Sequence, residues 1–162
     1  MRAIALLCCA ALSLAACSKS PEERAEEAIE QATGHEATVT KNGEQVTVKA
    51  EDGSVTISAG DSLKLPATFP KDVFLPKGHT VKSVMETDGA MLVTVEAPGE
   101  LGAMSADASA AMQRDGWKQM MSMQDAANHM LVYGKDKRSA SMSFGAEGEK
   151  ITLVVQVGEE KQ

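Results

Sequence analysis

The sequence predicts an α+β fold built mainly from antiparallel strands. Alternating runs of β-branched residues are separated by short turns that contain glycine, and turns this short connect antiparallel neighbours. Two further segments repeat apolar residues at helical spacing. We therefore expect an N-terminal helix with a three-stranded β-meander, followed by an antiparallel sheet of about six strands in the order ββαββββ, covered by one helix.

The composition excludes several classes of function. The chain has 162 residues and a formal charge of −7, so it lacks the basic character of a nucleic-acid-binding protein. All three cysteines precede residue 18, which leaves no disulfide framework or zinc cluster for the rest of the chain. The sequence contains no Gly-rich phosphate loop, HExxH motif or paired catalytic carboxylates. We expect a protein that is not an enzyme and carries no cofactor.

The first residues have the pattern of a secretory signal. Met1-Arg2 supplies a positive start, and residues 3–16 are apolar except for Ser13. This run is shorter than the roughly 20 residues that a membrane-spanning helix needs. Leu14-Ala15-Ala16-Cys17 resembles the lipobox of bacterial lipoproteins, in which a diacylglycerol is attached to the cysteine sulfur and the signal is cut just before it. An ordinary secretory peptide is the alternative, but the polar residues after Cys17 favour a lipoprotein.

The lipoprotein resemblance implies a modification site, a partner and a location. Residues 1–16 would form the signal peptide and residues 17–20 a lipidated tether, with Cys17 as the lipidation site and the bilayer as its partner. Several acyl chains together hold a protein stably on a membrane. In the lipoproteins that this chain resembles, an aspartate after the cysteine commonly retains the protein at the inner membrane. Ser18 stands there instead, which implies the outer membrane and its periplasmic face.

A helix is predicted directly after the tether, in a first module of residues 21–59. Ser20 and Glu23 can form a capping box around Pro21, and Gly34 is a natural end. The apolar stripe of this helix is narrow and mostly alanine, so it is either a solvated spacer or a docking element. The acidic residues on its other face are expected to be solvated: Glu22, Glu23, Glu26, Glu27 and Glu30.

Strands are predicted throughout the rest of the chain. Asn42-Gly43 and Asp52-Gly53 separate three alternating runs, and both dipeptides are strong hairpin signals. Residues 60–70 contain two prolines and are expected to be a linker. The second module, residues 71–158, has strand patterns at 80–86, 90–97, 117–123, 129–133, 139–144 and 151–157, a helix from 101 that Asp115-Gly116 ends, and then a tail, 159–162.

Two segments of the second module resemble the globular part of a group of small bacterial lipoproteins. They are Phe69-Pro70-x-Asp72-Val73-x-Leu75-Pro76-x-Gly78 and Asp115-Gly116-Trp117. These motifs are structural, so the resemblance implies a fold and transfers no catalytic residue. The sheet face that the helix leaves uncovered is then expected to be solvated or to bind something.

Gly60-Asp61-Ser62-Leu63 spells the motif of a family of serine esterases. In that family the serine is the nucleophile at a strand-to-helix turn, and a D-x-x-H motif near the C-terminus supplies the base. Here Pro66 would interrupt the helix, and Asp125 and His129 are four residues apart, not three. A serine needs an adjacent base to be nucleophilic. We therefore expect a linker turn here and keep the esterase as an alternative.

Methionine is unusually frequent, with ten residues. Thioethers are soft ligands that select Cu(I), so Met120, Met121, Met123 and His129 are candidates for a metal site. Flexible core packing is the other interpretation, because aromatic residues are few. The alternation along the strand and the spacing along the helix favour burial of four methionines: Met104, Met112, Met121 and Met123.

Together these patterns predict a lipoprotein of the outer membrane with a periplasmic body and no catalytic activity. Its expected role is binding or assembly in the envelope, with a protein or a small molecule as partner. A methionine-based copper-binding protein and a GDSL-type esterase are the alternatives. The sequence leaves open the identity of the partner, the sheet face that binds it and the oligomeric state.

Overall fold

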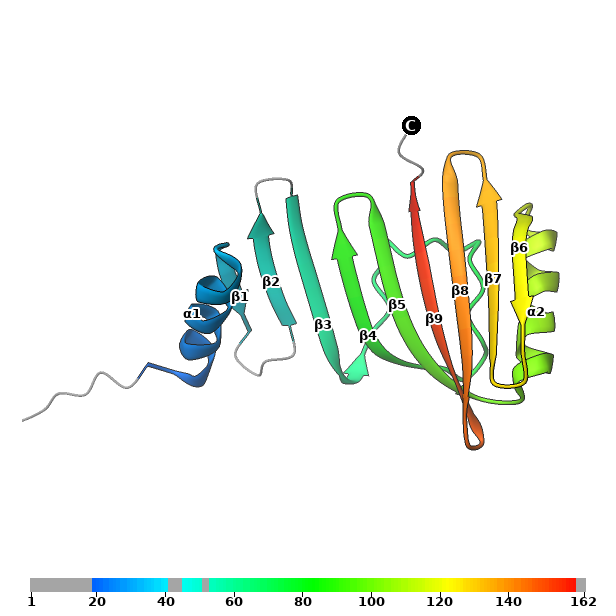
Figure 1. Cartoon of the computed structure of the whole chain (residues 1–162), viewed down its shortest axis with the longest axis horizontal. Coiled ribbons are helices and arrows are strands. Elements are labelled where there is room, and N and C mark those ends of the chain that lie inside the picture. The colour runs from blue at the N-terminus through cyan, green and yellow to red at the C-terminus, as the bar shows by residue number, and fades with distance from the viewer. Residues whose placement is uncertain (1–18, 41–44, 51–52, 160–162) are drawn as a thin grey trace, which may run out of the picture.

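The computed structural model describes residues 19–40, 45–50 and 53–159 (Figure 1). Over these residues the chain forms one antiparallel sheet of nine strands with two helices, which confirms the α+β class. The elements are α1 (Pro21–Thr33), β1 (Ala37–Val39), β2 (Gln45–Ala50), β3 (Gly53–Leu63), β4 (Thr80–Thr87), β5 (Ala90–Pro98), α2 (Leu101–Arg114), β6 (Lys118–Gln124), β7 (Asn128–Lys135), β8 (Arg138–Glu147) and β9 (Lys150–Glu159). The predicted signal at 1–16, Cys17, Ser18, Asn42-Gly43, Asp52 and residues 160–162 of the tail lie outside the described residues.

The sheet runs without a break from the first predicted module into the second. Its strand order is β1-β2-β3-β4-β5-β9-β8-β7-β6. β3 continues to Leu63, so residues 60–63 are strand rather than linker, and Leu63 lies opposite Val81 of β4. The prediction of a separate sheet of about six strands is wrong, because β3 and β4 pair along their edges and join the two ladders. The order ββαββββ of the second half is confirmed, and β9 returns to pair with β5.

One face of the sheet, the core face, carries the hydrophobic core. α2 packs over β6, β7 and β8 of this face. A helix about 10 Å wide covers two or three strands that are about 4.8 Å apart, so one helix cannot cover nine. The irregular segment 64–79 supplies further cover, and its Phe69 and Val73 are buried in the core. The prediction that one helix covers the sheet is therefore wrong, because α2 covers only β6, β7 and β8, and segment 64–79 covers a further part of the core face.

α1 forms its ends as the sequence predicts. The Ser20 Oγ accepts a hydrogen bond from the Glu23 N–H, and the Glu23 carboxylate accepts one from the Ser20 N–H. Gly34 ends the helix with a positive φ of 73°. Residues 21–33 are all described, and none of them is buried. Among the described residues, neither helix has the length and hydrophobicity of a membrane-spanning segment.

α1 also lies against β1, at one edge of the sheet (Figure 1). The Val39 N–H donates to Glu26 Oε1 at 2.8 Å, and the Ala37 N–H donates to Glu30 Oε1 at 3.2 Å. Glu26 and Glu30 were expected to be solvated, but they accept backbone hydrogen bonds from this edge strand. The helix therefore caps an edge whose amide groups would otherwise be open to another strand.

Candidate functional site

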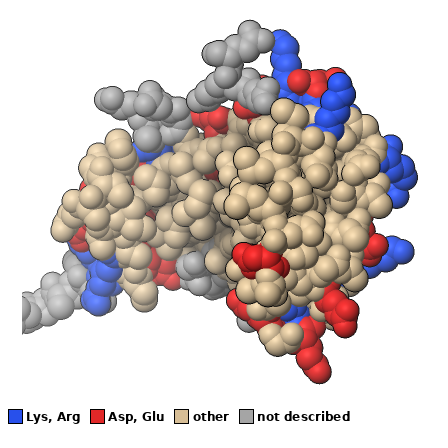
Figure 2. Space-filling view, turned by 45° about the vertical axis from the view of Figure 1, so that its right-hand side comes forward, with Lys and Arg blue, Asp and Glu red and all other residues tan. Residues whose placement is uncertain are grey.

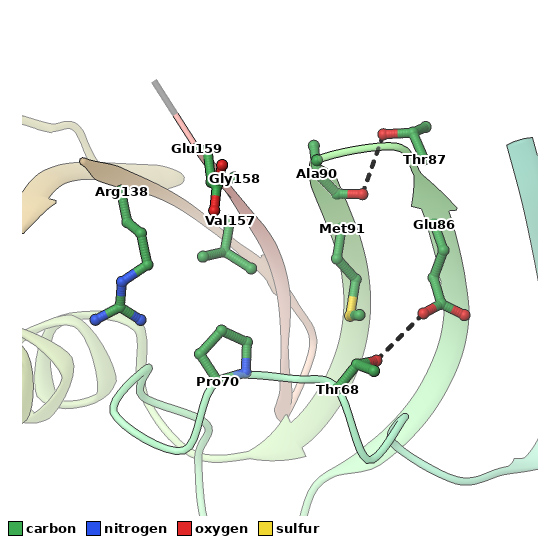
Figure 3. Close-up of a pocket in the computed structure, with 11 residues that line it drawn as sticks. Thr68, Pro70, Glu86, Thr87, Ala90, Met91, Arg138, Val157, Gly158 and Glu159 are labelled. Atoms are coloured by element: carbon green, nitrogen blue, oxygen red, sulfur yellow. Dashed lines mark hydrogen bonds between the residues drawn. The ribbon is translucent and has the colours of Figure 1, made fainter. Parts of the chain in front are cut away.

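A hollow of about 370 Å³ opens on the core face, beside segment 64–79 (Figure 3). It lies beyond the part of the face that α2 covers, over strands β4, β5, β8 and β9. Its volume falls in the range of small-molecule sites. The lining residues are Thr68, Pro70, Glu86, Thr87, Gly89, Ala90, Met91, Arg138, Val157, Gly158 and Glu159.

The walls of this hollow combine an apolar floor with two carboxylates. Met91 on β5 and Val157 on β9 lie opposite each other in the sheet, and both are buried. The Glu86 side chain comes from β4, and its carboxylate accepts a hydrogen bond from the Thr68 hydroxyl at 3.3 Å (Figure 3). Glu159 lies at the exposed end of β9. The site therefore suits a molecule that has an apolar part and a hydrogen-bond donor or a positive charge.

Arg138 borders the hollow, and its terminal nitrogens are bonded to Asp72. Arg138 Nη1 and Nη2 donate to Asp72 Oδ1 and Oδ2 at 3.0 and 2.7 Å, and Lys135 Nζ donates to Oδ2 at 2.6 Å. The hydrogen bonds from Arg138 hold the pKa of the Asp72 carboxyl well below its usual value, against the opposing effect of burial. The same bonds raise the pKa of the Arg138 guanidinium. Among the described residues that line the hollow, the two carboxylates of Glu86 and Glu159 outnumber the one cation, Arg138, whose terminal nitrogens are already bonded to Asp72.

Trp117 contacts the cluster of charged residues formed by Asp72, Lys135 and Arg138. Its Nε1–H donates to the Asp72 carbonyl at 2.7 Å, and the Arg138 guanidinium lies 4.9 Å from the centre of its ring. Lys135 Nζ lies 5.9 Å from the same ring and donates to the Asp115 carbonyl at 2.8 Å, at the end of α2. Asp72 and Trp117 belong to the two motifs quoted for the lipoprotein resemblance. These contacts fasten segment 64–79 over the core and thus build one wall of the hollow.

Sequence reasoning did not identify Glu86, Thr68 or Arg138. Asp72 lies 66 residues before Arg138, and no local pattern links the two. Glu86 was assigned to a strand only. A carboxylate two positions after an apolar strand residue, as Glu86 is after Val84, is a signal for a polar group on a buried face, and this signal could have identified Glu86.

The residues of the esterase alternative do not come together. Ser62 lies within β3 and not at a strand-to-helix turn, and the next helix among the described residues begins at Leu101. β4, β5, β9 and β8 separate β3 from β7, which carries His129. Asp125 Oδ1 instead accepts hydrogen bonds from the Ala127 and Asn128 N–H groups, both at 2.8 Å. The expected linker turn at 60–63 is also wrong, because these residues are strand.

His129 contacts a different serine, which the sequence did not indicate. Its Nδ1 lies 2.7 Å from the Ser105 hydroxyl of α2. A serine beside a histidine is the arrangement of an activated nucleophile. However, Ser105 is only 3% exposed, and its hydroxyl also donates to the Gly102 carbonyl at 3.1 Å. A hydroxyl buried between a helix and a strand cannot reach a substrate, so this contact joins α2 to β7.

The methionines of β6 and β7 are exposed, contrary to the burial predicted for Met121 and Met123. Met121 is 50% exposed, Met123 is 61% exposed and Met120 is 72% exposed. A β-bulge between Gln119 and Met121 explains the error. One extra residue in a strand turns every later side chain to the other face. Met121 and Met123 consequently lie on the face opposite the core, the open face. The expected burial of Met104 and Met112 on α2 is confirmed.

The bulge also divides the residues proposed as metal ligands. Met123 lies opposite Met130 on the open face, and the Met120 side chain lies over Gly134. His129, one residue along from Met130, points to the core face and contacts Ser105. It therefore cannot join the thioethers. Among the described residues, no group of three or more histidine, cysteine, aspartate or glutamate side chains could hold a metal ion.

No family model, curated protein or solved structure matches this chain.

Proposed function

We propose that this chain is a lipid-anchored, non-enzymatic binding protein of the bacterial envelope. The observation that carries the proposal is the lipobox pattern Leu14-Ala15-Ala16-Cys17 at the end of an apolar leader. The capping box at Ser20 begins the folded body three residues after Cys17, so the anchor would hold this body close to the membrane. Ser18 favours the outer membrane and its periplasmic face.

The anchor is tested by replacing the modified residue. In cells fed radiolabelled palmitate, we expect label in the full chain and none in the Cys17→Ser variant. The wild-type product should begin at residue 17 and sediment with outer membranes. A wild-type chain that carries no label, or that begins at another residue, would exclude the anchor.

The ligand site of this binding protein is the hollow beside segment 64–79. Its apolar floor of Met91 and Val157 would take an aliphatic group. Glu86 and Glu159 would take a cationic or hydrogen-bond-donating group, because two carboxylates line the hollow and the terminal nitrogens of Arg138 are bonded to Asp72. The ligand class that fits is a small cationic amphiphile.

Octylamine is a suitable first probe, with octanoate as the matched anion. Trp117 is the single tryptophan and stacks on Arg138, so its fluorescence reports on the hollow. We expect saturable quenching by octylamine, little by octanoate, and several-fold weaker octylamine binding in Glu86→Gln. Glu147→Gln, an exposed substitution on β8, is the control and should bind as the wild type does. Equal binding of the two probes would exclude this assignment.

A second candidate function is soft-metal binding on the open face. The observation in its favour is the exposure of Met121, Met123 and Met130 on one face of adjacent strands, with Met123 directly opposite Met130. Thioethers brought together in this way bind Cu(I) in preference to harder ions. A titration with Cu(I) or Ag(I) tests it. We expect Met123→Leu to weaken binding and the buried control Met142→Leu to leave it unchanged; no binding by the wild type would exclude this function.

A further inference from the structure

The two edge strands of the sheet, β1 and β6, differ in whether another element of the described chain bonds their outward backbone groups. At β1, Glu26 and Glu30 of α1 accept the outward N–H groups of the edge strand. At the other edge, all seven residues of β6 are exposed, and within the described chain no strand pairs with its outer side. β6 contains no proline, and its one charged residue is Lys118. Edge strands of soluble proteins usually carry more protection against pairing than this.

We propose that β6 is an interface at which it pairs, antiparallel, with β6 of a second copy of this chain. The Asp125 N–H donates to the Asn128 carbonyl at 2.9 Å, where the β6–β7 hairpin closes. Backbone groups alternate in direction along an antiparallel strand, so those of Ser122 and Gln124 point away from β7. A two-fold axis at Ser122 would bring these groups of two copies together. The result is one continuous sheet through both copies.

The side chains of β6 are complementary to themselves about this axis. A two-fold axis perpendicular to a sheet keeps the open faces of both copies on one side. With the axis at Ser122, Met121 of each copy lies opposite Met123 of the other, so the exposed thioethers pack on one another. Met120 is the extra residue of the bulge, so Met120 and Met121 together occupy one position of the strand. Counted in this way, Lys118 lies opposite Asp125 of the second copy. Apolar groups thus meet apolar groups, and opposite charges meet at both ends.

The core-face side of β6 also matches a second copy. Between α2 and β6 lies a groove of about 470 Å³, whose hydrogen-bonding side chains are uncharged. Ser109 and Gln113 line it from α2, and Gln119, Ser122 and Gln124 line it from β6. In the paired strand, Ser122 and Gln124 of the second copy would face the same groove and could bond these groups. Figure 2, which brings this side of the molecule forward, shows a broad surface whose charged side chains lie mostly towards the rim.

A disulfide trap at the axis tests the pairing. Directly opposed residues of antiparallel strands have Cα atoms about 5.5 Å apart, within the range that a disulfide spans. We expect the full chain with Ser122→Cys to form a covalent dimer under mild oxidation. Ser143→Cys, an exposed position on β8 within the sheet, is the matched control and carries the same native cysteines. Absence of dimer from Ser122→Cys, or equal dimer from both variants, would overturn the proposal.

Two further variants separate pairing from misfolding. Gln124→Pro removes an N–H that points away from β7, so it should abolish the covalent dimer of Ser122→Cys without changing the melting temperature. Lys118→Glu places like charges opposite each other, and we expect a several-fold lower rate of dimer formation at low salt, restored at high salt. Dimer that persists in Gln124→Pro refutes strand pairing. Crosslinking of Ser122→Cys to a different protein refutes the assignment of a second copy.

Discussion

Asp72→Ala removes the acceptor that fastens segment 64–79 to the sheet. Its carboxylate accepts three charge-assisted hydrogen bonds of 2.6–3.0 Å, two from Arg138 and one from Lys135. Such bonds contribute about 1.5–3 kcal/mol each when they are isolated. The three side chains here remain 24–31% exposed, so water re-solvates the two cations when the carboxylate is lost. We therefore expect a loss of about 2–3 kcal/mol in the free energy of unfolding, not the sum of three bonds.

The assay is urea unfolding of a double-mutant cycle. Asp72→Ala, Arg138→Ala and the double variant should give a coupling energy of about 1–2 kcal/mol, since both single variants break the same bidentate pair. The matched control is Arg114→Ala, because Arg114 also bonds a neighbouring carboxylate, Asp115, through two nitrogens but its side chain is 73% exposed. An exposed pair of this kind should contribute much less to the free energy of unfolding than the Asp72–Arg138 pair does.

A coupling energy below about 0.5 kcal/mol between Asp72 and Arg138 would refute the reasoning, because the pair would then behave as an ordinary surface ion pair. A loss for Arg114→Ala as large as that for Asp72→Ala would refute it as well. In that case partial burial against Trp117 would not strengthen the interaction.

Four other outcomes are expected. The pKa of Asp72 is lower in the folded than in the unfolded chain, so the ionised carboxylate stabilises the fold at pH values above its ordinary pKa of 3.8, and this stabilisation is lost as the pH falls below that value. Measurements of the free energy of unfolding across the acid range should show this loss in the wild type and not in Asp72→Asn. Met112→Ala, at a fully buried position, should lower the free energy of unfolding by about 2–4 kcal/mol, whereas Met120→Ala should change it little in the same urea assay. Tyr133 has a buried hydroxyl with no hydrogen-bond partner among the described residues, so Tyr133→Phe should leave the melting temperature unchanged or raise it. Ser20→Ala should speed hydrogen exchange in α1 by about five-fold, from the loss of a cap worth about 1 kcal/mol, and leave exchange of the core strands unchanged.

Several features of the fold follow from local sequence alone. The capping box at Ser20, the helix end at Gly34 and the turn at Gly89 each depend on the conformational preferences of a few adjacent residues. The order ββαββββ was predictable for the same reason, since periodicity marks each element separately.

The tertiary structure alone decided how these elements meet. The joining of β3 to β4 and the return of β9 to β5 depend on strand edges distant in the sequence, and no residue near either edge specifies its neighbour. The contact of Asp72 with Arg138, and with it one wall of the hollow, is equally non-local. The methionines show the physical reason most clearly. A strand has a side-chain period of two, so one additional residue at Met120 reverses which face Met121 and Met123 occupy, and only pairing with β7 reveals that insertion.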